Sequence, residues 1–259
     1  MDRRIGIFDS GVGGTSIWRE IVQFLPNEST TYLADSKNAP YGTRSKGEIL
    51  RLSIKNTEIL LEKGAKIIVV ACNTATTNAI AILRKNYPVP FIGIEPAIKP
   101  AALRTKSGKV GVLATKGTLT SNLFHNTSKI HAAGIEVFEQ EGEGLVELVE
   151  AGKAQSKEAQ DVLEKYVSPM LKEGIDCLVL GCTHYPYLIP ILKKIVPQNI
   201  QIIDSGFAVA KQTKAVLEQN GLLTLTTDKN ARHMFYSNSS LKVLNQLVSA
   251  KGEVDFLDF

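Results

Sequence analysis

The residues with the clearest chemical potential in this sequence are two cysteines, Cys72 and Cys182. Each ends an apolar run, KIIVVA before Cys72 and CLVLG before Cys182, and polar residues follow at once. A free thiol in such a place is usually core filling. The matched placement favours chemistry instead, because neighbouring groups can tune a thiol to give and take protons in the pH range of a cell.

Three kinds of chemistry are open to this pair. Zinc would take Cys72, Cys182 and His184, but the paired C-x-x-C spacing typical of structural zinc sites is missing. A redox disulfide would be unusual for two strand-end thiols in separate parts of the chain. Two thiols on opposite faces of one carbon, with Asp9 and His184 as tuning groups, would remove a proton from one side and return one from the other. That arrangement inverts a stereocentre.

A glycine-rich turn, DSGVGG at residues 9–14, is the second notable motif. A dinucleotide fingerprint starting at Gly11 would need glycine at position 16, which is Ser16, and the Gly-Lys-Ser/Thr of a phosphate-binding loop is absent. What remains is a turn whose backbone N–H groups open a helix and suit an anion such as a carboxylate. The simpler alternative is that the glycines only permit a tight turn.

Apolar runs alternate with helical patterns, which predicts a parallel α/β sheet with helices on both faces. The expected strands are residues 3–9, 30–35, 66–72, 90–95, 109–114, 176–181, 201–205 and 232–237. The expected helices are residues 16–25, 48–64, 76–87, 144–153, 156–174 and 208–221, with a further helix before the tail VDFLDF. Ligands of such sheets bind beyond the carboxyl ends of the strands, where the polar clusters stand.

The order of elements repeats, so that residues 5–96 and 110–206 read as two copies of one plan. Equivalent strands end at Ser10 and Thr115, and at Cys72 and Cys182. The fold class we expect is α/β, with two pseudo-symmetric parallel-sheet lobes that face each other across a cleft. One cysteine would enter the cleft from each lobe.

Composition limits the class of protein. The chain has 259 residues, 44% of them hydrophobic and 22% charged, which is typical of a globular protein and excludes a disordered one. A net charge of +4 without a Lys/Arg cluster gives no indication of nucleic-acid binding. Three cysteines form no disulfide framework, no signal peptide is recognisable, and no apolar run is long enough to span a membrane. We therefore expect a cytoplasmic protein.

Five motifs together resemble the bacterial glutamate racemases, within the aspartate/glutamate racemase family. They are FDSGVGG, APYG at residues 39–42, ACNTAT, GVLATKGT and LGCTHYP, in that order and over nearly the whole chain. The resemblance implies two pseudo-symmetric lobes, with lobe one formed by residues 1–97 and 207–259 and lobe two by residues 98–206.

The resemblance also implies roles for individual residues. Cys72 and Cys182 correspond to the two catalytic acid/bases, with Asp9 and His184 as their assistants and Glu150 as a further catalytic residue. The substrate contacts it implies are Asp9, Ser10, Tyr41, Gly42, Asn73, Thr74, Thr115, Thr118, Thr183 and His184.

The activity that the resemblance implies is interconversion of L- and D-glutamate, with no cofactor and no metal, to supply D-glutamate for peptidoglycan. It also implies a homodimer, and neither a nucleic acid nor a membrane as partner. The alternatives are an aspartate racemase or a one-cysteine decarboxylase on the same scaffold, or a two-lobed amino-acid-binding protein without catalysis. The other cysteine and the other histidines are expected to be structural. Cys177 is expected in the core, and His125, His131 and His233 at the surface or in structural positions.

Overall fold

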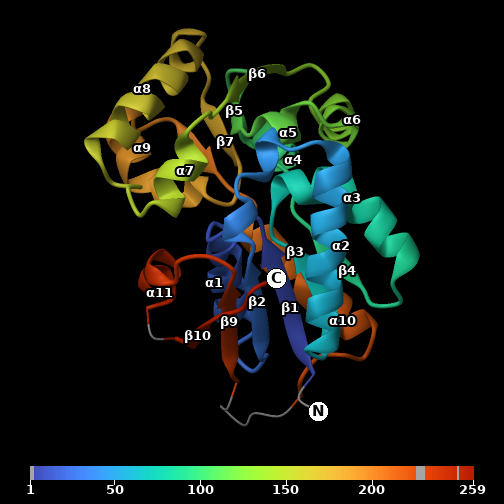
Figure 1. The fold of residues 1–259 in the computed structure, drawn as a ribbon. Coiled ribbons are helices and arrows are strands. Elements are labelled where there is room, and N and C mark those ends of the chain that lie inside the picture. Colours follow the sequence, from blue (N-terminus) through green and yellow to red (C-terminus); the bar gives the residue numbers. More distant parts are fainter. Residues whose placement is uncertain (1–2, 226–230, 250) are drawn as a thin grey trace.

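Two separate parallel β-sheets form the framework of the protein (Figure 1). The computed structural model describes residues 3–225, 231–249 and 251–259. The remaining residues belong to the segments 1–97 and 207–259 expected for lobe one and lie outside the described part. All strand pairs of the two sheets are parallel, as the alternation of apolar runs and helical patterns predicted.

The first sheet has six strands in the order β10-β9-β2-β1-β3-β4. These strands are β1 (Arg4–Asp9), β2 (Thr30–Ala34), β3 (Ala65–Val70), β4 (Phe91–Gly93), β9 (His233–Ser237) and β10 (Glu253–Phe256). Strands β9 and β10 come from the last part of the chain and extend the sheet beyond β2. The residue limits that we expected for the two lobes stay a prediction.

The second sheet has four strands in the order β6-β5-β7-β8. They are β5 (Lys109–Ala114), β6 (Glu136–Glu141), β7 (Cys177–Gly181) and β8 (Gln201–Ile203). The order matches that of β2-β1-β3-β4 in the first sheet, so β3 and β7 occupy equivalent places. Two copies of one plan, each with its own parallel sheet, are therefore present in the fold.

Helices cover both faces of the first sheet. They are α1 (Thr15–Phe24), α2 (Lys46–Glu62), α3 (Asn73–Asn86), α10 (Gly206–Gln219) and α11 (Lys242–Val248). Alternate residues of β3 point to opposite faces, so Ile67 and Val69 pack with α1 and α10 while Ile68 and Val70 pack with α2 and α3. A strand buried on both faces needs a continuous apolar run, which is what residues 67–71 supply.

The second sheet is covered in the same way. Its helices are α4 (Ile98–Arg104), α5 (Lys116–Leu119), α6 (Asn122–His131), α7 (Leu145–Glu150), α8 (Lys157–Lys172) and α9 (Ile189–Ile195). Cys177 and Val179 of β7 pack with α4 and α6, whereas Leu178 and Leu180 pack with α8 and α9. Within the described residues, no helix is long and apolar enough to cross a membrane.

The limits of α2 show how local sequence sets an element. Ser45 and Glu48 form a reciprocal capping box that starts the helix two residues before the predicted range. Gly64, with φ of +81°, lies just past its last residue, where a left-handed conformation ends helices. The helix therefore leads directly into β3, the strand that carries Cys72 at its end.

Two strands were not expected from the sequence, β6 and β10. Both lie at the edge of a sheet and both are rich in charged residues, with three glutamates in EVFEQE of β6 and a glutamate and an aspartate in EVDF of β10. An edge strand is exposed on at least one side, so it can do without the apolar run that identified the central strands.

Candidate active site

A small enclosed cavity lies where the carboxyl ends of strands from both sheets meet. It is lined by Ser10, Pro40, Tyr41, Gly42, Cys72, Asn73, Thr74, Thr115, Val146, Cys182, Thr183 and His184. Its volume of about 10 Å³ is roughly that of one water molecule. Both cysteines expected to do chemistry therefore face one small space, which must widen before a substrate larger than water can enter.

Cys72 occupies the start of a helix. It is the N-cap of α3, and its sulfur accepts a hydrogen bond from the backbone N–H of Ala75 at 3.4 Å. The thiol also donates to Ser10 Oγ at 3.7 Å. Burial, together with the negative charge of Asp9, raises the pKa of Cys72 well above the ordinary thiol value, although the Ala75 N–H opposes the rise. Cys72 is accordingly a protonated thiol in this closed form.

Asp9 is fully buried at the end of β1 and is tied into the turn that follows. Its Oδ2 accepts hydrogen bonds from the N–H groups of Gly14 at 2.8 Å and Gly11 at 3.3 Å, and its Oδ1 accepts one from Thr183 Oγ1 at 3.3 Å. Burial raises the pKa of this carboxyl to about 6, and the nearby His184 limits the rise. Asp9 therefore titrates close to neutral pH, where an acid or base is most useful.

Cys182 has a histidine beside it instead of a helix start. Its sulfur lies 3.7 Å from Nδ1 of His184, and Nε2 of the same ring lies 2.6 Å from Oε1 of Glu150. Burial alone would lower the pKa of His184, but its contacts with Cys182 and Glu150 outweigh burial and raise that pKa well above the ordinary value. The imidazole therefore favours the cationic form beside the Cys182 sulfur.

The glycine-rich turn holds anions, but they come from the protein. Gly11 and Gly14 bind Asp9, and the N–H of Val12 donates to Glu150 Oε1 at 2.6 Å. A Cβ on Gly11 would collide with the Glu150 carboxylate, and a Cβ on Gly13 with the His184 ring. The turn thus binds carboxylates, as predicted, but they are those of Asp9 and Glu150. Its glycines also allow close contact with the second lobe.

Asn73 follows Cys72 and is the polar residue of the cavity without partners. Both its Nδ2 and its Oδ1 are buried and make no hydrogen bond among the described residues. Such a group costs free energy unless a ligand or water satisfies it. Next to it, the hydroxyl of Thr74 lies 2.8 Å from that of Thr115 and 3.4 Å from that of Thr118, so this contact joins the two lobes.

Most residues that the sequence singled out come together here. Three of them do not line the cavity but contact residues that do: Asp9, Thr118 and Glu150. The sequence analysis missed Pro40 and Val146 as lining residues. Pro40 lies within the quoted APYG motif, whereas nothing in the local pattern separates Val146 from an ordinary apolar residue of a helix.

The residues expected to be structural lie elsewhere. Cys177 packs inside the second lobe, where burial raises its thiol pKa to about 11. His125 and His131 belong to α6, and His233 at the start of β9 hydrogen-bonds through Nδ1 to Thr30 Oγ1 at 3.0 Å. None of these four residues lines the cavity that holds Cys72 and Cys182.

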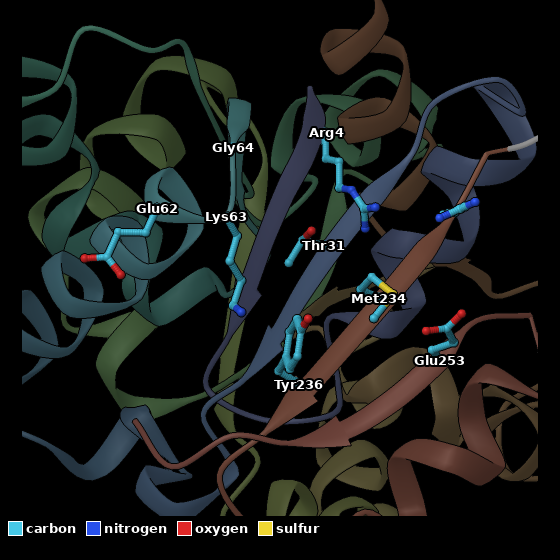
Figure 2. A pocket seen from close by; sticks show the side chains of 9 residues that line it. Arg4, Thr31, Glu62, Lys63, Gly64, Met234, Tyr236 and Glu253 are labelled. Carbon is cyan, nitrogen blue, oxygen red and sulfur yellow. The ribbon is translucent and has the colours of Figure 1, made fainter. Parts of the chain in front are cut away.

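A larger cavity of about 470 Å³ opens on the first sheet near the opposite ends of its strands (Figure 2). Arg4, Thr31, Met234, Tyr236 and Glu253 project into it from neighbouring strands. It is lined by no cysteine or histidine, and it lies at the end of the sheet where parallel strands begin. Its size alone therefore does not make it the catalytic cavity.

Comparisons with known proteins agree with this geometry. The chain is 50% identical over 230 residues to the glutamate racemase of Ectopseudomonas mendocina, covering 88% of each chain. It is 43% identical over 259 residues to that of Pseudomonas syringae pv. tomato, covering 98% of this chain and 93% of the relative. A solved glutamate racemase isoform of Bacillus anthracis superposes with a TM-score of 0.88 at 32% identity, covering 99% and 98% of the two chains.

The solved Escherichia coli glutamate racemase, crystallised with L-glutamate and the activator UDP-MurNAc-Ala, superposes with a TM-score of 0.87 at 32% identity, over 98% of each chain. Residues 5–213 match the family described as Asp/Glu/hydantoin racemase. The match covers the whole second sheet, strands β1 to β4 of the first sheet from residue 5 onward, and every residue of the cavity that holds the two thiols. By sequence, by fold and by the extent of these matches, this chain belongs to the Asp/Glu/hydantoin racemase family.

Proposed function

We propose that this protein is a glutamate racemase that interconverts L- and D-glutamate by two-base proton transfer at Cα. The observation that carries the proposal is the pair of thiols, Cys72 and Cys182, which end equivalent strands of two sheets and face one closed cavity. Glutamate as the substrate is supported by relatives 43 to 50% identical that are named glutamate racemases.

The proposed reaction balances with two thiols and no other reactant. The thiolate of one cysteine takes the proton from Cα, and the electron pair stays on the substrate as a carbanion. The thiol of the other cysteine then donates its proton to the opposite face of Cα. Each turnover leaves the first cysteine protonated and the second ionised, which is the starting state for the reverse reaction.

Each thiol has its own proton partner in this proposal. Asp9, with a pKa of about 6, assists Cys72, and His184 assists Cys182 while Glu150 holds its imidazole. A carboxyl with a pKa near 6 exchanges protons readily at neutral pH. An imidazole beside Cys182 would exchange protons with that thiol.

The proposed substrate contacts use groups that face the cavity. The buried Asn73 amide has no partner among the described residues and would satisfy a substrate carboxylate or ammonium group. Ser10, Thr74, Thr115 and Thr183 would add hydroxyl groups at the walls. The carbanion is stabilised by such hydrogen bonds more strongly in a dry, closed cavity than in water.

The test is to incubate the protein with L-glutamate in D₂O and to follow both optical activity and the Cα proton. Loss of the circular dichroism signal, together with exchange of the Cα proton for deuterium by NMR, is the expected result. Aspartate in a parallel sample should lose optical activity at least tenfold more slowly. Binding of glutamate without exchange would sink the proposal and favour a two-lobed binding protein.

The wider role that we propose is supply of D-glutamate for peptidoglycan, in the cytoplasm, by a homodimer. These three statements depend on the family and on the names of the relatives. The oligomeric state is checked by light scattering during size-exclusion chromatography, where a dimer has twice the 28.2 kDa mass of this chain.

A further inference from the structure

A polar network stands directly behind the Tyr41 wall of the cavity. Its centre is Asp35, a fully buried residue just beyond β2. The Asp35 carboxylate accepts hydrogen bonds from the Tyr41 hydroxyl at 2.5 Å, from Asn38 Nδ2 at 2.7 Å and from Asn238 Nδ2 at 2.5 Å. Hydrogen bonds to a carboxylate are about twice as strong as those between neutral groups, so this centre is rigid.

The Tyr41 hydroxyl is fully used by this network. It donates to Asp35 and accepts from Asn56 Nδ2 at 3.1 Å. Burial and the charge of Asp35 raise the pKa of Tyr41 well above its usual value, so the hydroxyl keeps its proton and stays a donor. Tyr41 and the adjacent Gly42 therefore contribute to the shape of the cavity and not to its hydrogen bonds. Asp35 fixes the position of the Tyr41 ring.

Asn238 connects this centre to the last residues of the chain. It follows β9, and its Nδ2 donates to Phe259 O at 2.9 Å as well as to Asp35. Its Oδ1 accepts from the backbone N–H of Lys37 at 2.9 Å. Both protons of its amide nitrogen and its oxygen are thus engaged, which fixes the orientation of the side chain.

Residues 257–259 are held along the first lobe at this point. The N–H of Leu257 donates to Ser237 O at 3.0 Å, and the Phe259 ring lies 5.2 Å from the ammonium group of Lys55 on α2. The segment therefore bridges β9 and α2, which stand on either side of the network. From Phe259 the chain of contacts runs through Asn238 and Asp35 to Tyr41.

We propose that Asn238 is a positioning residue for the substrate cavity and that residues 257–259 hold it in place. Asn238 touches no substrate: it orients the Asp35 carboxylate, which holds the Tyr41 wall next to Cys72. The inference depends on the proposed racemase activity, because its effect is measured on glutamate turnover. It assigns a role in glutamate binding to Asn238 and residues 257–259, which lie outside the cavity and outside the matched range 5–213.

The test compares Asn238→Ala with Asn245→Ala. Asn245 is an exposed asparagine of α11 whose side chain, among the residues that the structure describes, bonds only Leu241 O, so it is the matched control. We expect Asn238→Ala to raise the KM for glutamate about tenfold, the loss of one hydrogen bond to a charged group, with kcat lowered less than threefold. Asn245→Ala should leave both constants within twofold of the parent.

A double-mutant cycle separates positioning from a general loss of stability. In a Tyr41→Phe background, which already lacks the bond to Asp35, Asn238→Ala should raise KM less than twofold further. An equal increase in both backgrounds would overturn the proposal, as would a parent-like KM in Asn238→Ala.

A chain that ends at residue 256 provides a second variant if Asn238→Ala folds poorly. It keeps Asn238 and removes only its Phe259 partner and the neighbouring contacts, and a KM raised at least threefold is expected. A parent-like KM in this variant contradicts the role of residues 257–259. If the parent protein itself does not racemise glutamate, the proposed function fails first. If the parent racemises glutamate and these variants have the same rate as the parent at low substrate concentration, the role of Asn238 is refuted and the proposed function stands.

Discussion

The surroundings of Cys72 and of Cys182 differ although the two thiols end equivalent strands. Cys72 starts the 14-residue helix α3 and lies near the buried carboxyl of Asp9. Cys182 precedes only a short 3₁₀ turn, and its neighbour is the imidazole of His184. One lobe thus presents a thiol with a raised pKa, and the other presents a sulfur beside a ring that favours a positive charge.

This difference shows how two copies of one plan can serve the two halves of a reaction. A thiol that keeps its proton is suited to donate one, and a sulfur beside an imidazolium is suited to accept one. The turn after β1 also contacts this site from the other lobe, because the N–H of Val12 donates to Glu150 Oε1 and Gly13 packs against the His184 ring. Closure of the cavity therefore completes the second thiol site.

The largest expected effect is loss of either thiol. Cys72→Ala and Cys182→Ala should each lower kcat by at least about 10³-fold in both directions, because each removes an obligatory proton carrier. Cys177→Ala is the control, since it removes a thiol from β7 outside the cavity, and its kcat should stay within twofold. Turnover is measured by circular dichroism, and normal rates in both catalytic variants would refute the two-base mechanism.

The next effect concerns stability and the Asp9 side. The folded-state pKa of Asp9 is raised from 3.8 to about 6. The stabilisation from its protonated form is therefore complete below pH 3.8 and is lost as pH rises through 6, a change of about 3 kcal/mol in the unfolding free energy. Asp9→Asn lacks this titration. Urea unfolding of both proteins is measured at pH 4, 5.5 and 7. The unfolding free energy of Asp9→Asn should rise relative to that of the parent as the pH increases. A difference in unfolding free energy that is the same at all three pH values would contradict the raised pKa of Asp9.

Variants of the two assistants should separate the two thiols. His184→Gln and Asp9→Asn are each expected to lower kcat about 10²-fold. Each slows one proton transfer, so the isotope effects of Cα-deuterated L- and D-glutamate should become unequal, in opposite senses for the two variants. Unequal effects in the same sense would mean that both assistants serve one thiol.

The smallest effect tests the contact between the lobes. Gly13→Ala places a methyl group against the His184 ring and should lower kcat about tenfold, because small displacements of reacting groups are costly. The control is Gly47→Ala in α2, where a Cβ meets nothing within 4 Å. That variant should keep parent-like turnover and gain up to about 1 kcal/mol of stability. Equal kcat values for the two alanine variants would show that the close contact between Gly13 and the His184 ring does not matter for catalysis.

Central strands and long helices were predictable because a strand covered on both faces needs a continuous apolar run and a surface helix needs a stripe of apolar residues. The edge strands β6 and β10 were missed, because exposure removes that requirement. For the site, the matched placement of Cys72 and Cys182 at equivalent strand ends predicted that they share a cleft, and both line the cavity. Val146 carried no local signal, because only the position of α7 relative to the first lobe turns one of its apolar side chains toward the cavity.

The sequence by itself therefore determined the alternation of elements, the two-fold plan and the matched thiols, since each depends on residues close together in the chain. Tertiary structure alone placed Glu150 against His184 and Asp35 against Tyr41. The pKa of His184 is raised by Cys182 and by Glu150, 34 residues away, and Tyr41 is held through Asp35 by Asn238, 203 residues beyond Asp35. Charge and position at these groups follow from burial and from contacts between distant segments, and neither is written in local spacing.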